Sequence, residues 1–321
     1  MNSLTVKSVG QIKKANIAFG DLTVLIGPQA TGKSIVLQLL KLLMDSGYVL
    51  NELKRYGLDW NRELAAFLDL YFGEGMRGIW HSEKSRISFN GDAVDLNKLV
   101  ARQRKVKEES LFFIPAQRVL TLREGWPRPF TDFSPGDPFA VRNFSEKLRL
   151  LMETENGAGR LLFPQTKRLK KEIRAMLADA MFSGFGLSVE RHRSQKRLVL
   201  GEEASETSLP YMVWSAGQRE FVPLLLGLYW LLPPSSTTRK EGVDWVIIEE
   251  LEMGLHPRAI SSALTLVMEL LSRGYKVCLS THSTHVLDIV WAWRILKEYK
   301  AEPSYLLEIL AAPKSQAMRF M

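Results

Sequence analysis

Cysteine and long apolar runs are nearly absent from this 321-residue sequence. Its one cysteine, Cys278, excludes a disulfide within the chain and is typical of proteins in a reducing compartment. No apolar run is long enough to cross a bilayer, and residues 1–10 lack the apolar core of a secretory signal. We therefore expect a cytoplasmic protein that has no membrane partner.

Internal repeats, low-complexity tracts and long heptad runs are also lacking, which argues against repeat proteins and coiled coils. What the chain does have is 46% hydrophobic residues, enough for a full core, and a formal net charge of +8. An excess of positive charge favours polyanions, so nucleic acid is a candidate partner.

Three basic clusters are candidates for such contacts. They lie on a helix expected over residues 167–182, in a hairpin turn at residues 191–197, and at residues 102–107. The basic helix face is formed by Lys167, Arg168, Lys170, Lys171 and Arg174. A solvated helix face and a surface that contacts a phosphate backbone or an acidic partner both explain this pattern.

The two ends of the chain predict an α/β fold. The first end has short strands at residues 4–9, 11–17 and 22–26, then a glycine loop, then helical apolar spacing over residues 34–44. The last third alternates buried strands with helices, namely strands at residues 244–250 and 276–281 and helices at residues 258–273 and 284–293. Strand, glycine loop and helix in this order are the setting that a phosphate-binding loop needs.

The middle of the chain predicts helices with two hairpins. The helices are expected at residues 48–69, 144–155 and 167–182, and a buried strand at residues 111–115. One hairpin turns at Asn90-Gly91, the dipeptide that most favours a two-residue hairpin loop, and the other joins strands at residues 187–191 and 197–200.

The glycine loop matches the phosphate-loop pattern G-x-x-x-x-G-K-[ST] at every fixed position. Its residues are Gly27, Pro28, Gln29, Ala30, Thr31, Gly32, Lys33 and Ser34. The glycines let backbone N–H groups face the phosphates, Lys33 supplies charge to the β- and γ-phosphates, and the Ser34 hydroxyl coordinates Mg²⁺. ATP and Mg²⁺ are therefore the predicted ligands.

Other polar residues follow predicted buried strands. Glu249 and Glu250 end an apolar strand, as in a Walker B motif, although exposed acids after a strand are common in any protein. His282 and Gln117 follow two more predicted strands. Each is an ordinary turn residue by itself, but beside a γ-phosphate a histidine ring donates a hydrogen bond to the transferring group, and Gln117 is well placed for the metal or the attacking water.

A helix start at residues 215–218 is open to two interpretations. Ser215 and Gln218 have the spacing of a capping box, S-x-x-Q, which by itself only begins the apolar helix that follows. A capped helix start beside a glycine, here Gly217, is also an anion site, suited to a γ-phosphate from a second subunit.

The order of these elements resembles that of ABC-type ATPase heads of the SMC, RecF and OLD branch, and not that of the transporter branch. The segments that carry the resemblance are residues 19–34, 113–118, 249–257 and 281–288. The Glu-Leu-Glu-x-x-Leu-His-Pro pattern within them resembles bacterial phage-defence ATPases of the OLD type. The resemblance covers both ends of the chain well and the middle hardly at all.

The resemblance implies a single ABC-type ATPase domain over residues 1–321, with a mixed sheet core, N-terminal antiparallel strands and a helical lobe. The core lobe is expected at about residues 1–45, 110–118 and 240–321, and an inserted helical and hairpin lobe at about residues 119–239.

Residue roles also follow from the resemblance. Glu250 polarises the attacking water, His282 and Gln117 assist it, and Ser34, Gln117 and Glu249 hold Mg²⁺. Two chains dimerise around ATP, and the residues Ser215, Gly217 and Gln218 complete the partner's site. The family usually has Asp where this chain has Glu249, so hydrolysis is expected to be slow, and Leu251 replaces a common proline.

The function expected on this basis is an ATPase whose ATP-dependent dimerisation controls a separate effector in phage defence or nucleic-acid surveillance. A nuclease is one candidate effector, because no nuclease segment is recognised in this chain. Two alternatives remain open, namely a scaffold in which ATP is a structural ligand with negligible hydrolysis and the ATPase subunit of a transporter, which the 249–257 segment disfavours.

Overall fold

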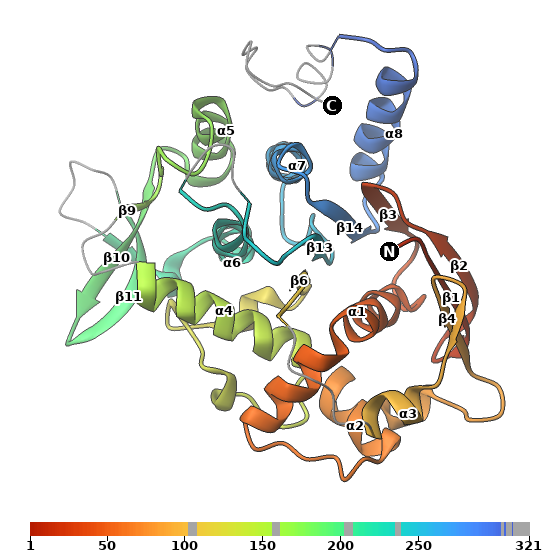
Figure 1. Cartoon of the computed structure of the whole chain (residues 1–321). Coiled ribbons are helices and arrows are strands. Elements are labelled where there is room, and N and C mark those ends of the chain that lie inside the picture. Colours follow the sequence, from red (N-terminus) through yellow and green to blue (C-terminus); the bar gives the residue numbers. More distant parts are fainter. Residues whose placement is uncertain are drawn as a thin grey trace.

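The computed structural model describes residues 1–101, 108–155, 161–201, 208–234 and 239–302, together with residues 305 and 310. Its centre is a parallel sheet in the order β3-β14-β13-β6 (Figure 1). The strands are β3 (Leu22–Ile26), β14 (Lys276–Thr281), β13 (Trp245–Ile248) and β6 (Leu111–Ile114). Both ends of the chain therefore contribute to one sheet, as the sequence predicts.

Alternate side chains of this sheet enter two different hydrophobic clusters. In β13, Val246 and Ile248 pack into one cluster, whereas Trp245 and Ile247 pack into the other. Cys278 in β14 is fully buried in the second cluster. A parallel sheet is covered on both faces, which explains why β13 and β6 read as unbroken apolar runs and not as alternating ones.

The helices cover the two faces of the central sheet. One cluster includes side chains of α1 (Lys33–Arg55), α2 (Leu64–Phe72) and α3 (Leu96–Ala101). The other cluster draws on five helices, which are α4 (Phe139–Glu155), α5 (Lys171–Leu177), α6 (Ala216–Leu231), α7 (Pro257–Ser272) and α8 (Thr284–Glu298). Figure 1 shows α1 on one side of the central strands and α6 and α7 on the other.

Two antiparallel sheets flank this core. The N-terminal sheet has the order β2-β1-β4-β5 and consists of β1 (Ser3–Val9), β2 (Ile12–Ala18), β4 (Arg86–Phe89) and β5 (Asp92–Val94). Asn90 and Gly91 both have positive φ, 53° and 93°, so the predicted hairpin turn is confirmed.

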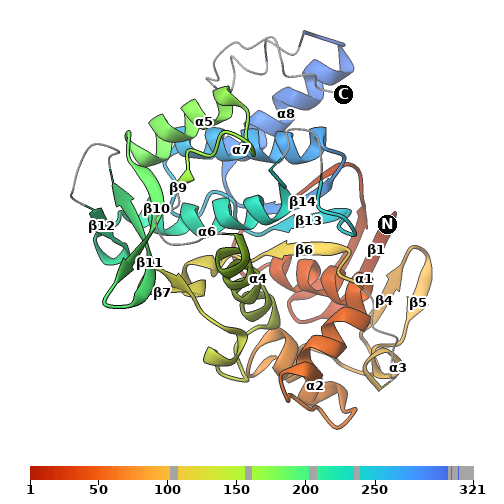
Figure 2. The ribbon, with the colours of Figure 1, turned by 60° about the vertical axis from the view of Figure 1, so that its left-hand side comes forward.

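The second antiparallel sheet lies at the opposite side of the molecule (Figure 2). Its order is β12-β11-β10-β9, with β9 (Leu161–Phe163), β10 (Gly186–His192), β11 (Gln195–Gly201) and β12 (Ser208–Pro210). A two-stranded ribbon, β7 (Leu122–Arg123) and β8 (Trp126–Pro127), contacts β11. Short 3-10 helices η1 (Met76–Ile79), η2 (Arg118–Thr121), η3 (Phe130–Asp132) and η5 (Tyr211–Val213) and the π-helix η4 (Ala178–Phe182) complete the described elements.

The fold is thus α/β with a phosphate-loop core, N-terminal antiparallel strands and a helical lobe, as predicted. The division into a core lobe and an inserted lobe at residues 119–239 stays a prediction. Among the described residues, no helix combines the length and apolar character needed to span a membrane.

Several predicted elements have other bounds than expected. The helix expected at residues 34–44 runs on to Arg55 through a kink at Asp45, and the helix expected at residues 48–69 is broken before α2. The helix expected from residue 167 begins at Lys171, because the Arg168 side chain is drawn inward to bind the carbonyl oxygens of Tyr229 and Leu232.

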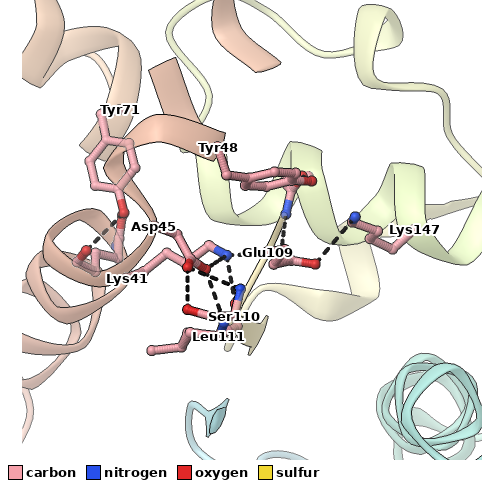
Figure 3. A network of polar contacts seen from close by, with 10 residues as sticks. Lys41, Asp45, Tyr48, Tyr71, Glu109, Ser110, Leu111 and Lys147 are labelled. Atoms are coloured by element: carbon pink, nitrogen blue, oxygen red, sulfur yellow. Dashed lines mark hydrogen bonds and ion pairs between the residues drawn. The ribbon is translucent and has the colours of Figure 1, made fainter. Parts of the chain in front are cut away.

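A buried ion network fixes α1 against β6 (Figure 3). Lys41 Nζ binds Asp45 Oδ2 at 2.7 Å, Glu109 Oε1 at 2.8 Å and the Leu111 carbonyl oxygen at 2.6 Å. The Asp45 carboxylate in turn accepts the backbone N–H groups of Ser110 and Leu111, each at 3.0 Å. The charged pair Lys41 and Asp45 therefore joins the kink of α1 to the start of β6.

Candidate nucleotide-binding and catalytic site

Most of the predicted site residues follow the strand ends at one edge of the central sheet. β3 leads into Gly27, β14 into His282, β13 into Glu249 and β6 towards Gln117. All four strands are parallel, so their carboxyl ends meet at this edge. Crevices at the carboxyl ends of strands are where open α/β sheets bind ligands.

The phosphate loop, residues 27–34, has a backbone that requires its glycine. Gly32 has φ of 90° and serves as N-cap of α1, and a Cβ there would lie 2.6 Å from Ile12 Cγ1. No side chain caps the start of α1, so its first N–H groups remain available to an anion. Lys33 Nζ donates to the carbonyl oxygens of Gly27 at 2.6 Å and Pro28 at 2.7 Å, which holds the ammonium over the loop.

Glu249 lies directly behind this loop. Its side chain is buried, and its Oε2 accepts the N–H of Ala116 at 3.1 Å. Burial raises the pKa of Glu249 to about 7, against the opposing effects of the Ala116 N–H and the Ser34 hydroxyl, both of which lower it. Ser34 and Glu249, from opposite ends of the chain, therefore meet.

The oxygen chemistry of this pair fits a magnesium ion. Glu249 Oε1 is buried and has no hydrogen-bond partner of ordinary geometry among the described residues. A carboxylate and a hydroxyl are the hard oxygen ligands that Mg²⁺ takes alongside substrate phosphates. Gln117, which follows the end of β6, is exposed and is the N-cap residue of η2.

Glu250 occupies a strained backbone position. Its φ is 43°, in the left-handed region, which costs a non-glycine residue about 1–3 kcal/mol. Its N–H donates to Ser280 Oγ at 3.2 Å, which ties it to the end of β14. The strand expected at residues 244–250 consequently ends at Ile248, and the Glu250 side chain is half-buried at the sheet edge.

His282 is held at the same edge by Glu252. The buried Glu252 carboxylate accepts the His282 N–H at 2.8 Å, and its Oε1 lies 3.5 Å from His282 Nδ1. The histidine side chain itself is 37% exposed. This arrangement fixes the His282 backbone and leaves its ring partly exposed at the sheet edge, and the contact with Glu252 was missed from the sequence.

The helix start at residues 215–218, called the signature loop from here on, lies apart from the phosphate loop. Its capping box is present, because Ser215 Oγ accepts the Gln218 N–H at 3.2 Å and Gln218 Oε1 accepts the Ser215 N–H at 3.0 Å. Gly217 packs close to the turn after β13, where its Cβ would lie 3.2 Å from the Gly254 carbonyl oxygen. Among the described residues, no hydrogen bond joins the signature loop to the phosphate loop.

A family model described as "AAA domain, putative AbiEii toxin, Type IV TA system" matches residues 78–288, more than half of the chain. The chain belongs to this AAA-domain family. The match together with the phosphate-loop geometry identifies an ATPase-type nucleotide-binding domain. No curated protein matches the sequence.

Several solved structures resemble this AAA domain at low identity. An SMC head bound to the C-winged helix domain of ScpA has 12% identity and a TM-score of 0.46, covering 89% of this chain and 91% of that one. CbiO1 from Clostridium perfringens has 15% identity and a TM-score of 0.36, covering 87% and 78%. The cassette MJ0796 bound to ADP and phosphate has 12% identity and a TM-score of 0.37, covering 88% and 89%. No residue role follows from these likenesses.

The basic clusters of the AAA domain are only partly on its surface. Arg168 is buried, so it does not belong to the predicted basic face, and Lys170 pairs with Glu269 at 3.3 Å. The hairpin residues Arg191 and Arg193 are exposed. The cluster at residues 102–107 lies outside the described residues.

Arg118 is a further buried cation at the site, and sequence reasoning gave it no role. It is fully buried one residue after Gln117, and its guanidinium reaches the turn that follows β13. The sequence offers no local signal for it, because a single arginine after a strand is ordinary.

Proposed function

We propose that this AAA domain binds ATP with Mg²⁺, hydrolyses it, and uses ATP-dependent dimerisation to control a separate effector protein. The observation that carries the proposal is the meeting of Ser34 with the buried Glu249 at the edge where the phosphate loop and Glu250 also lie. Two carboxylates, a lysine-bearing anion loop and a metal-fitting hydroxyl are the set that phosphoryl transfer to water requires.

Each residue has a definite task in the proposed reaction. The N–H groups of residues 27–34 and the Lys33 ammonium bind the β- and γ-phosphates. Mg²⁺, held by Ser34, Glu249 and Gln117, would neutralise charge on the phosphate oxygens. Glu250 orients and polarises the attacking water, and the His282 ring donates to the transferring group.

Dimerisation would bring the signature loop of one chain to the phosphates bound by another. The start of α6 is exposed at Ser215 and Ala216, and the neighbouring Met212 and Val213 are 69% and 63% exposed. Exposed apolar side chains beside an anion site favour an interface. A two-fold arrangement would then use the same two surfaces twice.

The family description names a putative AbiEii toxin and a type IV toxin–antitoxin system. A toxin and an antitoxin are two components, which is compatible with a chain that acts with a second protein. We therefore place this domain in phage defence or a related form of nucleic-acid surveillance. A nuclease is one candidate effector, and the exposed arginines of the β10–β11 hairpin make nucleic acid a candidate partner.

One observation favours a second function, a scaffold held together by ATP without hydrolysis. In the metal-free site burial raises the pKa of Glu249 to about 7, so binding of Mg²⁺ has to displace a proton there and is weakened near neutral pH. In this alternative the dimer would form on ATP and persist. Steady-state turnover of the wild type distinguishes the two functions, because the scaffold releases no phosphate.

The proposed hydrolysis is tested by Glu250→Gln. Removing the water-polarising carboxylate while keeping its shape should lower phosphate release by about 100-fold or more and leave ATP bound, so that light scattering shows a larger dimer fraction with ATP than for the wild type. Glu63→Gln, an exposed residue ahead of α2, is the matched control and should match the wild type. Wild-type turnover in Glu250→Gln would show that Glu250 is not the base.

A further inference from the structure

The Arg118 side chain contacts both the turn that follows β13 and the first part of α6. It is 0% exposed and begins η2, directly after Gln117. Its Nη1 donates to the Glu249 carbonyl oxygen at 3.0 Å and its Nη2 to the Glu250 carbonyl oxygen at 3.2 Å. One guanidinium thus binds the backbone of both acids of the site.

These bonds hold a backbone segment that would otherwise relax. Glu250 has φ of 43°, a conformation that persists only where its surroundings enforce it. Arg118 donates to the carbonyl oxygen of Glu250, and Ser280 Oγ, at the end of the neighbouring strand, accepts the N–H of Glu250. The peptide units on both sides of Glu250 are therefore fixed, and with them the direction of its side chain.

The other edge of the guanidinium contacts α6. Arg118 Nε donates to the Glu220 carbonyl oxygen at 3.1 Å and lies 3.7 Å from Glu220 Oε2. Glu220 lies in the second turn of α6, five residues after Ser215. A movement of the signature loop along the α6 axis is therefore transmitted to Arg118 without an intervening flexible segment.

Packing at the same turn is too close to absorb such a movement. A Cβ at Gly254 would lie 2.9 Å from Glu220 Cγ, and one at Gly217 would lie 3.2 Å from the Gly254 carbonyl oxygen. Close-packed elements shift together and do not deform independently. The start of α6 and residues 249–254 thus behave as one unit that Arg118 crosslinks.

Arginine suits this task better than lysine. Its planar guanidinium offers five donors in fixed directions, and here three of its nitrogens bind oxygens of two elements. A lysine would keep the charge, but its donors all sit on one nitrogen, so it would bind fewer of these oxygens. The nearby carboxylates of Glu220, Glu252, Glu250 and Glu249 oppose the lowering of the Arg118 pKa by burial.

We infer that Arg118 is a positioning residue that aligns Glu250 for water activation and couples this alignment to the signature loop through Glu220. The inference rests on the proposed function, and it adds that docking of a phosphate at the signature loop sets the catalytic carboxylate. Signature-loop engagement and hydrolysis are then one linked event.

The test compares Arg118→Lys with Arg142→Lys. Arg142 is as deeply buried and also binds a carbonyl oxygen, that of Leu70, but its contacts lie outside the site. We expect Arg118→Lys to lower kcat by about 10–100-fold, because small misplacement of a catalytic group has effects of this size. The affinity of Arg118→Lys for a labelled ATP analogue should stay within about threefold of the wild type. Arg142→Lys should lose as much thermal stability as Arg118→Lys but keep the wild-type kcat.

A double-mutant cycle tests the coupling. Glu220→Ala removes only the carboxylate contact at 3.7 Å and keeps the carbonyl hydrogen bond, so it should lower kcat less than Arg118→Lys does. The double variant should be no slower than Arg118→Lys alone, since both lesions weaken one connection. Fully additive losses would overturn the coupling, and kcat changes that follow thermal stability in both lysine variants would overturn the positioning role. A wild type that binds ATP without releasing phosphate would instead refute the proposed hydrolysis, and the positioning role with it.

Discussion

At the scale of single residues, Glu249 makes the fold sensitive to pH. Burial raises its pKa from 4.5 to about 7 in the folded chain. The folded state therefore holds this proton more tightly than the unfolded state does. Its stabilising contribution is fully present below about pH 4.5 and is lost as the pH rises through about 7.

Glu249→Gln should remove this dependence. Without nucleotide and Mg²⁺, the variant should be more stable than the wild type at pH 8, by up to about 3 kcal/mol, and the difference should shrink towards pH 5. Urea unfolding at the two pH values measures this, with Glu63→Gln as the exposed control. An equal difference at both pH values would contradict a buried carboxyl that titrates near neutrality.

At the scale of elements, the α1 kink depends on the Lys41 network. Burial lowers the pKa of Lys41, but Glu109 and Asp45 more than offset this and raise it, and Lys41 and Lys147 together lower the pKa of Glu109. Lys41 and Glu109 are therefore both charged near neutral pH, and removing Lys41 leaves buried negative charge without compensation.

Lys41→Met should accordingly destabilise the protein by about 3–5 kcal/mol, because it leaves Asp45 and Glu109 buried and short of one partner. Lys54→Met, on an exposed position of the same helix, is the matched control and should change stability by less than about 1 kcal/mol. Thermal and urea unfolding measure both. If the two variants lost the same stability, the network would not be what fixes α1 to β6.

Local sequence signals predicted the elements that depend on local chemistry. The phosphate loop, the Asn90-Gly91 turn, the Ser215 capping box and the parallel strands β14 and β3 are specified by residues close together in the chain. The expectation that residues 27–34, 117, 249–250 and 282 share one site came from the resemblance, and the structure pairs the strands that lead to them in parallel.

Long-range polar contacts explain what the sequence did not predict. α1 continues past residue 44 because the Asp45 carboxylate binds backbone N–H groups 65 and 66 residues away. The α5 start shifts because Arg168 binds carbonyl oxygens on and just beyond the end of α6. Arg118 and Glu252 likewise bind backbone atoms of distant turns. The identity of a single side chain does not reveal which distant backbone atoms it will bind in the folded chain.

At the scale of the whole molecule, the proposed dimer predicts complementation between inactive chains. Ser215→Arg disables the signature loop, and Lys33→Ala disables the phosphate loop. In a mixed dimer one composite site carries both lesions and the other carries neither, so an equal mixture should recover about a quarter of wild-type ATPase activity if subunits pair at random.

Each inactive variant measured alone is the control for this mixture, and native mass spectrometry reports whether subunits exchange. Activity that stays at the background of the single variants despite demonstrated exchange would place the signature loop in the same chain as the phosphates it serves. In that case Ser215 would only stabilise α6. A loss of thermal stability in Ser215→Arg, without complementation, would indicate this role.

The pairing of β3 with β14 has a consequence for synthesis of the chain. Residues 22–26 lie beside residues 277–281, so the phosphate loop emerges from the ribosome long before the strand that flanks it. At a translation rate of about 5–20 residues per second, the delay is on the order of 10–60 seconds. Until then Glu249 and His282 are absent or unplaced, so the phosphate loop of a nascent chain lacks the residues that we propose act beside it. If the proposed hydrolysis holds, the chain is inert as an ATPase while it is being made.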